Sequence, residues 1–492
     1  MAVKNKVLDF LGENKVVLLF VLLCIGAIAA SGNPLTFVAG ELFTRIGRNG
    51  FMVLALLIPV LAGMGLNFGI TIGAIAAQIA VFWIVYWGFT GIQGFLLSVV
   101  MATPVAIFFG FLVGRLFNKM KGAEMIAGMV LGFFADGLYQ LFFLYIIGGI
   151  IPVSNERLII SGGIGVKNTI DLAGNLKYSL DTVSMLKLLE ILFIISVVLL
   201  VIKIIFNSVK KTGVSPVKDF ILMGVLAALY AATCVPSVES FLATDRLLLL
   251  HGVIIGIAAM ALLQIWRIIS AKYVKKIEGY DVRKPVAALI TLGLVFAMTY
   301  IGPVEEILLY VHIPVTTYFA IVVLCIFNNM LLRTRLGQNM RTVGQSRVVA
   351  NAAGINVDRT RIIAMIISTV LACWGQLIYL QNIGTFSTYG AHTQVGQFAI
   401  AALLVGGASV QKATNKQAIL GVILFHTLFI VAPQAGKELF NNAQLGEYFR
   451  VFVAYGVIAV SLAMHAWKTK AKPKAISPPT SPPTEEAAPE RV

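Results

Sequence analysis

Charged residues are scarce in this sequence. Only 12% of the 492 residues are Asp, Glu, Lys or Arg, and 59% are hydrophobic. A soluble globular domain has about a quarter of its residues charged. The shortage of charge therefore excludes an ordinary soluble protein and favours one that lies largely in lipid.

Cysteine and histidine are also rare, with four and five copies. The cysteines have no C-x-x-C spacing, and the histidines have neither H-x-x-x-H nor H-E-x-x-H spacing. Neither a disulfide framework nor a metal site is indicated. The sequence also lacks a G-x-x-x-x-G-K-[ST] nucleotide loop and a G-x-S-x-G elbow. We therefore predict no metal, no cofactor and no catalytic residue.

Long apolar runs recur from one end of the chain to the other. Runs near 18 residues are long enough to cross a bilayer as helices, and about fourteen can be counted. The sequence predicts an all-α polytopic integral membrane protein with about 14 transmembrane helices.

The formal net charge of +16 indicates orientation. Most Lys and Arg lie in alternate connections between apolar runs, which is the positive-inside pattern, and no basic face that would suit nucleic acid is apparent. The sequence predicts that both termini are cytoplasmic. Arg45, Arg48 and the segment 151–187 are exceptions, because they fall in connections expected outside.

Two predicted spans are unusual. Residues 63–80, "GMGLNFGITIGAIAAQIA", are so rich in glycine that a continuous helix is doubtful. Residues 394–409 are short and end in paired glycines before Ala408 and Ser409. Each pattern fits either a break in the helix, buried in protein, or close packing through small residues.

An arginine-rich segment begins at Gly337. A topological interpretation is that Arg333, Arg335, Arg341, Arg347, Arg359 and Arg361 only hold a loop on the cytoplasmic side. A second interpretation is a short amphipathic helix between residues 337 and 354 that docks a cytoplasmic partner. Its apolar face would consist of Met340, Val343, Val348, Val349 and Ala352.

This segment resembles the coupling motif of ABC importer permeases of the branched-chain amino acid and simple-sugar family, which also includes nucleoside permeases. The family motif is approximately G-R-x-(I/M)-R-A-V-G-x-N-x-x-A-A-x-x-A-G-I-N-V. The residues that match it are Gly337, Met340, Arg341, Val343, Gly344, Ala350, Gly354, Ile355, Asn356 and Val357. Gln338, Ser346 and Val349 depart from it. "GLNFGITIGAIAA" and "FAIAALLVGGAS" resemble two further family segments.

The resemblance implies a domain organisation. It covers residues 40–150 and 304–465, so that residues 188–303 read as an insertion of four extra helices. The resulting scheme is an N-terminal membrane module (1–150), an external loop (151–187), the insertion (188–303), a C-terminal membrane module (304–467) with the coupling segment 337–357, and a disordered cytoplasmic tail (468–492).

The resemblance also implies a function. The chain would be the permease subunit of an ATP-driven importer in a bacterial plasma membrane, for a simple sugar or a nucleoside, with branched-chain amino acids as an alternative. Its expected partners are a separate ATPase subunit, a second permease chain and an external solute-binding protein. The residues expected to couple it to the ATPase are Gly337, Met340, Arg341, Val343, Gly344, Arg347, Gly354 and Asn356.

Polar residues inside apolar spans are candidates for the substrate pathway, because such groups face the bundle interior or a cavity. They are Asn67, Gln78, Asp136, Gln140, Asn328, Asn329, Gln376, Gln381 and Gln397. Each one taken singly is more often an interhelical hydrogen bond than a substrate contact. Asp136 could serve a proton relay in an ion-driven secondary transporter, the main alternative function, but its own span contains no basic partner.

Overall fold

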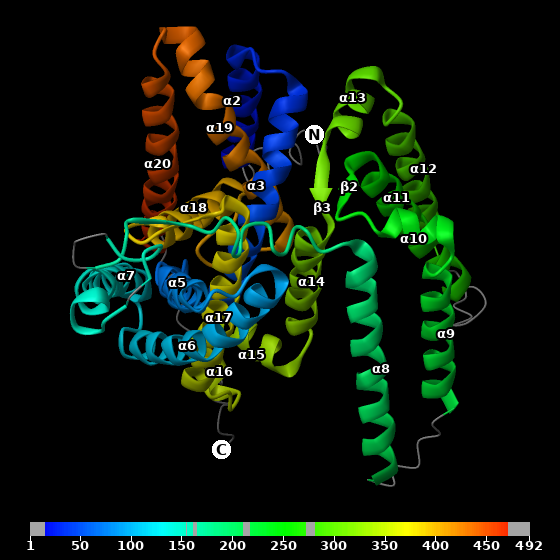
Figure 1. The fold of residues 1–492 in the computed structure, drawn as a ribbon, viewed down its shortest axis with the longest axis horizontal. Coiled ribbons are helices and arrows are strands. Elements are labelled where there is room, and N and C mark those ends of the chain that lie inside the picture. The colour runs from blue at the N-terminus through cyan, green and yellow to red at the C-terminus, as the bar shows by residue number, and fades with distance from the viewer. Residues whose placement is uncertain (1–14, 154, 161–164, 210–216, 272–280, 471–492) are drawn as a thin grey trace, which may run out of the picture.

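The computed structural model describes residues 15–153, 155–160, 165–209, 217–271 and 281–470. These residues form helices almost throughout (Figure 1), which confirms the predicted all-α membrane class. The strands described are short and pair antiparallel, β1 (Thr169–Asp171) with β4 (Thr385–Ser387), and β2 (Arg246–Leu248) with β3 (His312–Pro314). From residue 471 onward, the predicted tail lies outside the described residues.

The first part of the chain forms the helices α2 (Lys15–Ser31), α3 (Leu35–Ala55), α4 (Leu57–Leu61), α5 (Ile70–Trp87), α6 (Gly91–Lys119), α7 (Glu124–Leu141) and η1 (Phe142–Ile150). The middle part forms α8 (Met185–Val209), α9 (Val217–Thr233), α10 (Pro236–Leu242), α11 (Leu249–Ile269), α12 (Arg283–Met298) and α13 (Gly302–Tyr310). The last part forms α14 (Val315–Leu331), α15 (Arg335–Gln345), α16 (Arg347–Ala352), α17 (Val357–Ile383), α18 (Ala391–Val405), α19 (Asn415–Phe440) and α20 (Ala443–Lys470).

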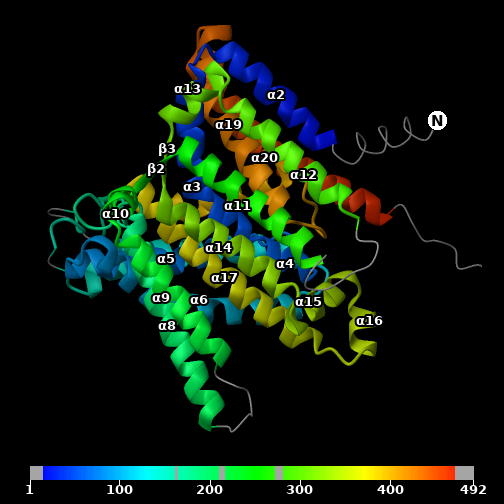
Figure 2. The ribbon, with the colours of Figure 1, turned by 90° about the vertical axis from the view of Figure 1, so that its right-hand side faces the viewer.

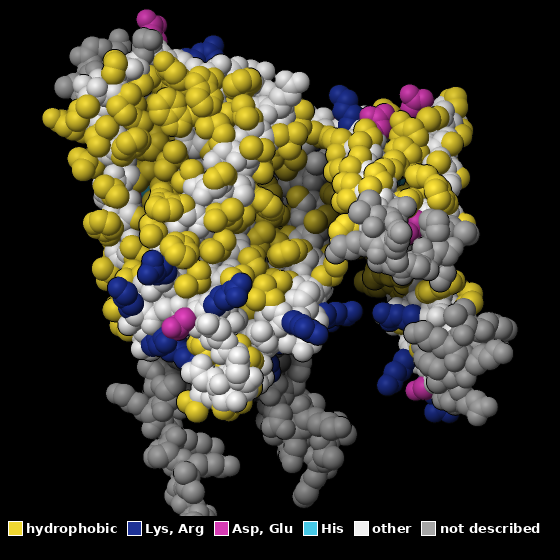
Figure 3. Space-filling model, turned by 90° about the horizontal axis from the view of Figure 1, so that it is seen from below, with side chains coloured by type: hydrophobic (Ala, Val, Ile, Leu, Met, Phe, Trp, Pro, Cys, Tyr) yellow, Lys and Arg dark blue, Asp and Glu magenta, His cyan; other side chains and the backbone are white. Residues whose placement is uncertain are grey.

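The described helices include 8 that are long and apolar enough to span a membrane, or up to 11 if each bent pair counts as one span. The predicted number of fourteen is not confirmed. Hydrophobic side chains cover most of the face in Figure 3, and Lys and Arg side chains gather in a band toward one edge. This distribution fits a protein that lies in a bilayer with a basic rim.

Helix α17 forms the centre of the bundle, where it packs against α3, α5 and α6 (Figure 1). Small residues allow its close contacts. A Cβ on Gly110 of α6 would lie 2.7 Å from Cα of Ile366, and a Cβ on Gly375 would lie 3.1 Å from the backbone nitrogen of Met52. The backbones therefore touch directly, as in other membrane bundles whose interfaces use glycine and alanine.

The glycine-rich span is interrupted. Residues 62–69 are not helical and separate α4 from α5, and Gly63 and Gly65 both have φ of +71°, a region that glycine enters without steric cost. The interruption is buried, because α7, α15 and Val410 cover it. This agrees with the first of the two interpretations of residues 63–80.

The prediction that Arg45 and Arg48 lie in an external connection is wrong. Both lie within the continuous helix α3, in a candidate span that covers residues 35–61. Nε of Arg48 donates to Oδ1 of Asn382 at 2.7 Å. The charges of these arginines indicated a loop, but the structure keeps them half-buried in the bundle, where an ionisable side chain is costly unless it is paired.

The segment 151–187, predicted to be external, is anchored by a buried carboxylate. Asp181 is 2% exposed and accepts hydrogen bonds from Thr317 Oγ1, from Gln381 Nε2 at 3.0 Å and from Asn382 Nδ2 at 3.0 Å. The network joins this segment to α14, α17 and, through Asn382, to Arg48. Gln381, considered above as a pathway residue, thus has a structural partner.

The helices of residues 188–303 stand beside the main bundle in Figure 1, and most of their apolar side chains are exposed. They contact the remainder through β2 against β3, through α13 against α3 and through α8 against α14. Figure 2 shows that α15 and α16 lie toward the same side of the molecule as the start of α2 and the end of α20.

Replacement of Asp181 by alanine tests the anchoring network. It would leave three buried donors without their acceptor, and each such group costs about 1–3 kcal/mol. We expect D181A to lower the thermal unfolding temperature of the detergent-purified protein clearly. The control D171A, at an exposed position of the same segment, should leave it nearly unchanged. Equal melting of the two variants would contradict the role assigned to Asp181.

Candidate functional site

The predicted coupling segment forms two helices rather than one. Thr334 caps α15 by accepting a hydrogen bond from Gly337 N at 3.2 Å. At Ser346 the backbone is extended, with φ −158° and ψ 117°, and the Ser346 hydroxyl caps α16 by accepting from Val349 N. Serine competes for backbone hydrogen bonds and so favours caps over helix interiors. A single helix from 337 to 354 is therefore wrong.

This break changes which side chains are buried. Met340 and Val343 are 1% and 2% exposed, as the amphipathic pattern predicted. Val348 and Val349, predicted on the same face, are 79% and 59% exposed, and Ala352 is exposed as well. Ala350 is buried in their place, against Val343 and Val357. The two valines form an exposed apolar tip on α16.

Gly344 brings the backbone of α15 against the interruption between α4 and α5. A Cβ on Gly63 would lie 2.7 Å from Cα of Gly344, and a Cβ on Gly344 would overlap the carbonyl oxygen of Leu61. No side chain fits at either position. The coupling segment and the broken span are therefore in direct backbone contact.

One carboxylate joins the coupling segment to α7. Glu124 forms ion pairs with both Arg347 of α16 and Arg361 of α17. The side chain of Arg361 is 0% exposed, that of Glu124 is 7% exposed and that of Arg347 is 31% exposed. Because a buried guanidinium requires a charged partner, Glu124 holds three helices together at their ends.

The end of α6 and its connection to α7 each add a contact to α17. Asn118 Nδ2 donates to the carbonyl oxygen of Asp358 at 2.8 Å, and Lys121 Nζ lies 2.8 Å from Asp358 Oδ1. Asn356 caps α17 by accepting from Arg359 N at 2.9 Å, and Gly354 precedes it with φ +74°. The structure thus assigns local roles to the predicted residues Gly354 and Asn356.

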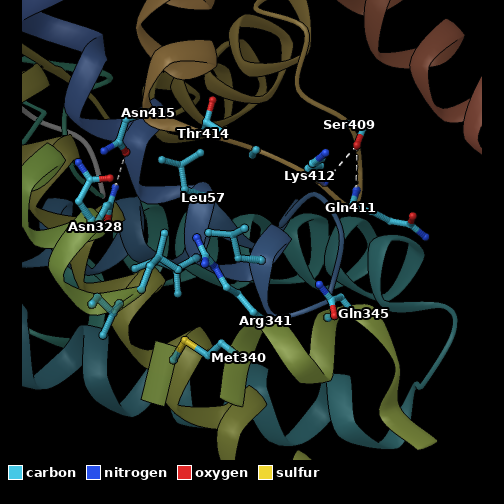
Figure 4. A pocket seen from close by; sticks show the side chains of 17 residues that line it. Leu57, Asn328, Met340, Arg341, Gln345, Ser409, Gln411, Lys412, Thr414 and Asn415 are labelled. Atoms are coloured by element: carbon cyan, nitrogen blue, oxygen red, sulfur yellow. Dashed lines mark hydrogen bonds between the residues drawn. The ribbon is translucent and has the colours of Figure 1, made fainter. Parts of the chain in front are cut away.

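Arg341 does not lie with Arg347. It lines a cavity of about 710 Å³ between α4, α14, α15 and residues 409–415. Figure 4 shows its side chain reaching from α15 into this cavity, with Ser409, Lys412 and Thr414 on the opposite wall. Gly344, Met340 and the predicted pathway residues Asn328 and Asn329 line the same cavity.

Three predicted pathway residues are fully buried near the centre of the bundle. Asn67, Gln78 and Gln376 are each 0% exposed. Both polar atoms of Asn67 and both of Gln376 have no hydrogen-bond partner among the described residues, and neither does Oε1 of Gln78. Buried polar groups are nearly always paired, so these amides carry unused capacity to bind a polar solute or water.

Asp136 has a basic partner on another element. Nε2 of His392, at the start of α18, lies 2.6 Å from Oδ1 of Asp136, and Gln140 Nε2 donates to Oδ2 of Asp136 at 3.1 Å. The ring of Tyr139 packs edge-on against His392, with 4.8 Å between centroids. Asp136 has no basic partner in its own helix, but His392 of α18 supplies one.

Gln397, the last predicted pathway residue, accepts a hydrogen bond from the Tyr455 hydroxyl at 2.9 Å. It also lines a small cavity of about 30 Å³ with Thr71, Thr393 and Gly396. The hydroxyls of the two threonines have no partner among the described residues. The predicted pathway residues thus divide between the unpaired buried amides, the Asp136 pair, the Asp181 network, this small cavity and the Arg341 cavity.

Sequence reasoning missed Glu124 and His392. Glu124 lies at a helix start in a basic connection, where an acidic residue is ordinary, and its partners follow more than two hundred residues later. His392 has no metal-ligand spacing, and its partner Asp136 is 256 residues distant. Among the described residues, no three His, Cys, Asp or Glu side chains gather as metal ligands would.

A family profile described as "Branched-chain amino acid transport system / permease component" matches residues 214–462, just over half of the chain. The chain belongs to this family. It is accordingly a membrane-embedded permease component and not the ATPase of the transporter. The match begins inside the segment 188–303 and includes the coupling segment, α17, α18 and α19.

Two relatives come from Lactococcus lactis subsp. cremoris (strain MG1363). The chain is 28% identical over 159 residues to the Nucleoside ABC transporter permease protein NupB, covering 31% of this chain and 40% of that protein. It is 31% identical over 159 residues to the Nucleoside ABC transporter permease protein NupC, covering 32% of this chain and 48% of that protein. The chain therefore spans less than half the length of these curated relatives. No solved structure matches it.

The ion pairs of Glu124 make a prediction about stability. E124Q would leave buried Arg361 without a charged partner, and removal of one member of a buried pair costs about 3–5 kcal/mol. We expect a large fall in the thermal unfolding temperature of the purified permease. K121Q, which removes an exposed ion pair in the same connection, should cost less than about 1 kcal/mol. A mild effect of E124Q would show that Glu124 does not hold these helices.

Proposed function

We propose that this permease imports a nucleoside at the expense of ATP that a separate ATPase subunit hydrolyses. A second permease chain and an external solute-binding protein would complete the transporter. Both termini, α15 and α16 would face the cytoplasm of a bacterial cell. The observation that carries the proposal is the family membership, together with the coupling segment that the fold presents at one end of the bundle.

The contacts of the coupling segment provide a route for force. The ATPase would bind the exposed tip of α16 at Val348 and Val349. Movement of that tip would reach α7 and α17 through the ion pairs of Glu124. It would reach the α4–α5 interruption through the backbone contact of Gly344. A broken span moved at its break can open the pathway to alternate sides by rigid-body displacement.

The chemistry of the bundle interior supports a neutral solute with several hydroxyl groups. The unpartnered atoms of Asn67, Gln376 and Thr71 are neutral amide and hydroxyl groups. Such groups exchange hydrogen bonds with sugar hydroxyls without the cost of burying a charge. The two relatives are named as nucleoside permeases, and a nucleoside carries a pentose that offers these hydroxyls.

A simple sugar is the second candidate. The segment "GLNFGITIGAIAA" resembles the corresponding segment of simple-sugar permeases, and Asn67 within it is one of the unpartnered groups. A branched-chain amino acid is less well supported, because its ammonium and carboxylate would both need partners. Among the candidate residues, the carboxylate of Asp136 already contacts His392 and Gln140.

Substitution at the tip of α16 tests the coupling. Val348 is exposed and loses little folded-state contact on substitution, whereas a carboxylate would disrupt an apolar docking contact. We expect V348D to lower solute-stimulated ATP hydrolysis by the reconstituted transporter about tenfold, equivalent to ~1.4 kcal/mol of docking energy. A173D, an exposed position in segment 151–187, is the control. Undiminished hydrolysis by V348D would refute docking at this tip.

Competition for uptake tests the substrate. Proteoliposomes that contain the complete transporter would be supplied with radiolabelled uridine and ATP. We expect excess unlabelled adenosine or cytidine to suppress uptake, and excess leucine to have no effect. Uptake of labelled ribose without uptake of uridine would favour the sugar alternative and overturn the nucleoside assignment.

A further inference from the structure

The 710 Å³ cavity beside α15 has the composition of a ligand site. Its volume falls within the range of about 300–1,000 Å³ that is usual for pockets that bind small molecules. Leu57, Ile58 and Leu61 of α4 form part of an apolar wall, and Leu332 and Met340 extend it. Polar side chains from residues 409–415 lie across from this wall (Figure 4).

Two cations face this cavity without an anion. Arg341 comes from α15 and Lys412 from the connection between α18 and α19. None of the described lining residues is Asp or Glu, and neither cation forms an ion pair with any described residue. Two unpaired cations at one cavity produce a positive potential that attracts an anion.

The start of α19 adds to this potential. Thr414 and Asn415 line the cavity, and α19 is a helix of 26 residues with no acidic residue in its first turn. Thr414 Oγ1 caps the N–H of Gln417, and the N–H groups before it lack intrahelical partners and favour a negative charge. This helix start therefore reinforces the two side-chain cations and does not act alone.

A buried acceptor completes the set. Asn328 is 2% exposed, and its Nδ2 donates to Leu54 O and to Asn415 Oδ1 at 3.3 Å each. Its Oδ1 has no partner among the described residues. Because this oxygen can only accept, it suits a hydroxyl group of a ligand.

We propose that the cavity lined by Arg341, Lys412 and Asn328 binds a phosphate ester that also carries a hydroxyl and an apolar portion. The phosphate would lie between Arg341, Lys412 and the start of α19, the hydroxyl would donate to Asn328, and the apolar portion would lie on the α4 wall. A nucleoside monophosphate and the headgroup of phosphatidylglycerol share this chemistry. Only the assignment of the cavity to the cytoplasmic side rests on the proposed function.

Occupation of the cavity would have a mechanical consequence. A ligand held by both Arg341 and Lys412 would bridge α15 to the segment that precedes α19. The coupling segment could then not separate from that segment without loss of the ligand. The bound phosphate ester would restrain the transporter from the side opposite to its external binding protein.

Binding to the purified permease alone tests the proposal. The protein would be placed in phosphatidylcholine nanodiscs and titrated by calorimetry with uridine monophosphate, uridine and inorganic phosphate. We expect uridine monophosphate to bind at least about tenfold more tightly than uridine, equivalent to ~1.4 kcal/mol. K412Q should weaken this binding by a similar factor. K416Q, an exposed lysine in the next turn that does not line the cavity, should not.

A second arm distinguishes the lipid source. Native mass spectrometry of protein purified from mixed lipids would detect retained phosphatidylglycerol, which K412Q should release and K416Q should keep. Retention of the lipid without binding of uridine monophosphate assigns the site to the headgroup. If neither ligand binds, or if K412Q and K416Q behave alike, the site does not exist. No ATPase or transport assay enters this test, so its failure would leave the proposed import function standing.

Discussion

The structure depends on a backbone contact between two glycines. Gly63, in the interruption between α4 and α5, meets Gly344 of α15 with no room for a side chain on either. An interruption at membrane depth exposes peptide groups that lipid cannot satisfy, so it must be covered by protein. Helix α15 provides part of that cover, and the most irregular part of the bundle is thereby joined to the segment that a partner would move.

The charged side chains near this contact lie at the same end of the bundle. Glu124 lies between Arg347 and Arg361, and the second of these arginines is fully enclosed. Arg341, one turn before Gly344, points away from that cluster into a cavity with Lys412. The arginines that the sequence presents as one basic segment therefore have different environments. Arg361 and Arg347 hold helices together, whereas Arg341 is available to a ligand.

Much of the architecture could be predicted from local sequence. Apolar run length predicted the membrane class, the glycines of residues 63–80 offered an interruption as one of two interpretations, and the motif around Gly344 indicated a segment distinct from an ordinary loop. These features depend on residues within about twenty positions of one another, which a sequence displays directly.

The remaining features depend on distant pairs. Asp136 pairs with His392, Glu124 with Arg361 and Asp181 with Asn382, and in each pair the two residues are 200 or more positions apart in the sequence. Arg45 and Arg48 were misassigned because a charge in an apolar region reads as a loop unless its partner is known. The valines of α16 were misassigned because the capping hydroxyl of Ser346 ends one helix and starts another, which shifts the helical phase.

The hydrogen bonds around Asp181 also show how the lateral helices join the chain. Asp181 accepts from Thr317, and Thr316 Oγ1 donates to the carbonyl oxygen of Val183 at 3.0 Å. The residues just before α8 and the start of α14 thus lie at neighbouring points in space. The helices from α8 to α13 begin and end at this junction and also pack on α3 through α13, so the two ends of the block need no long connection across the bundle.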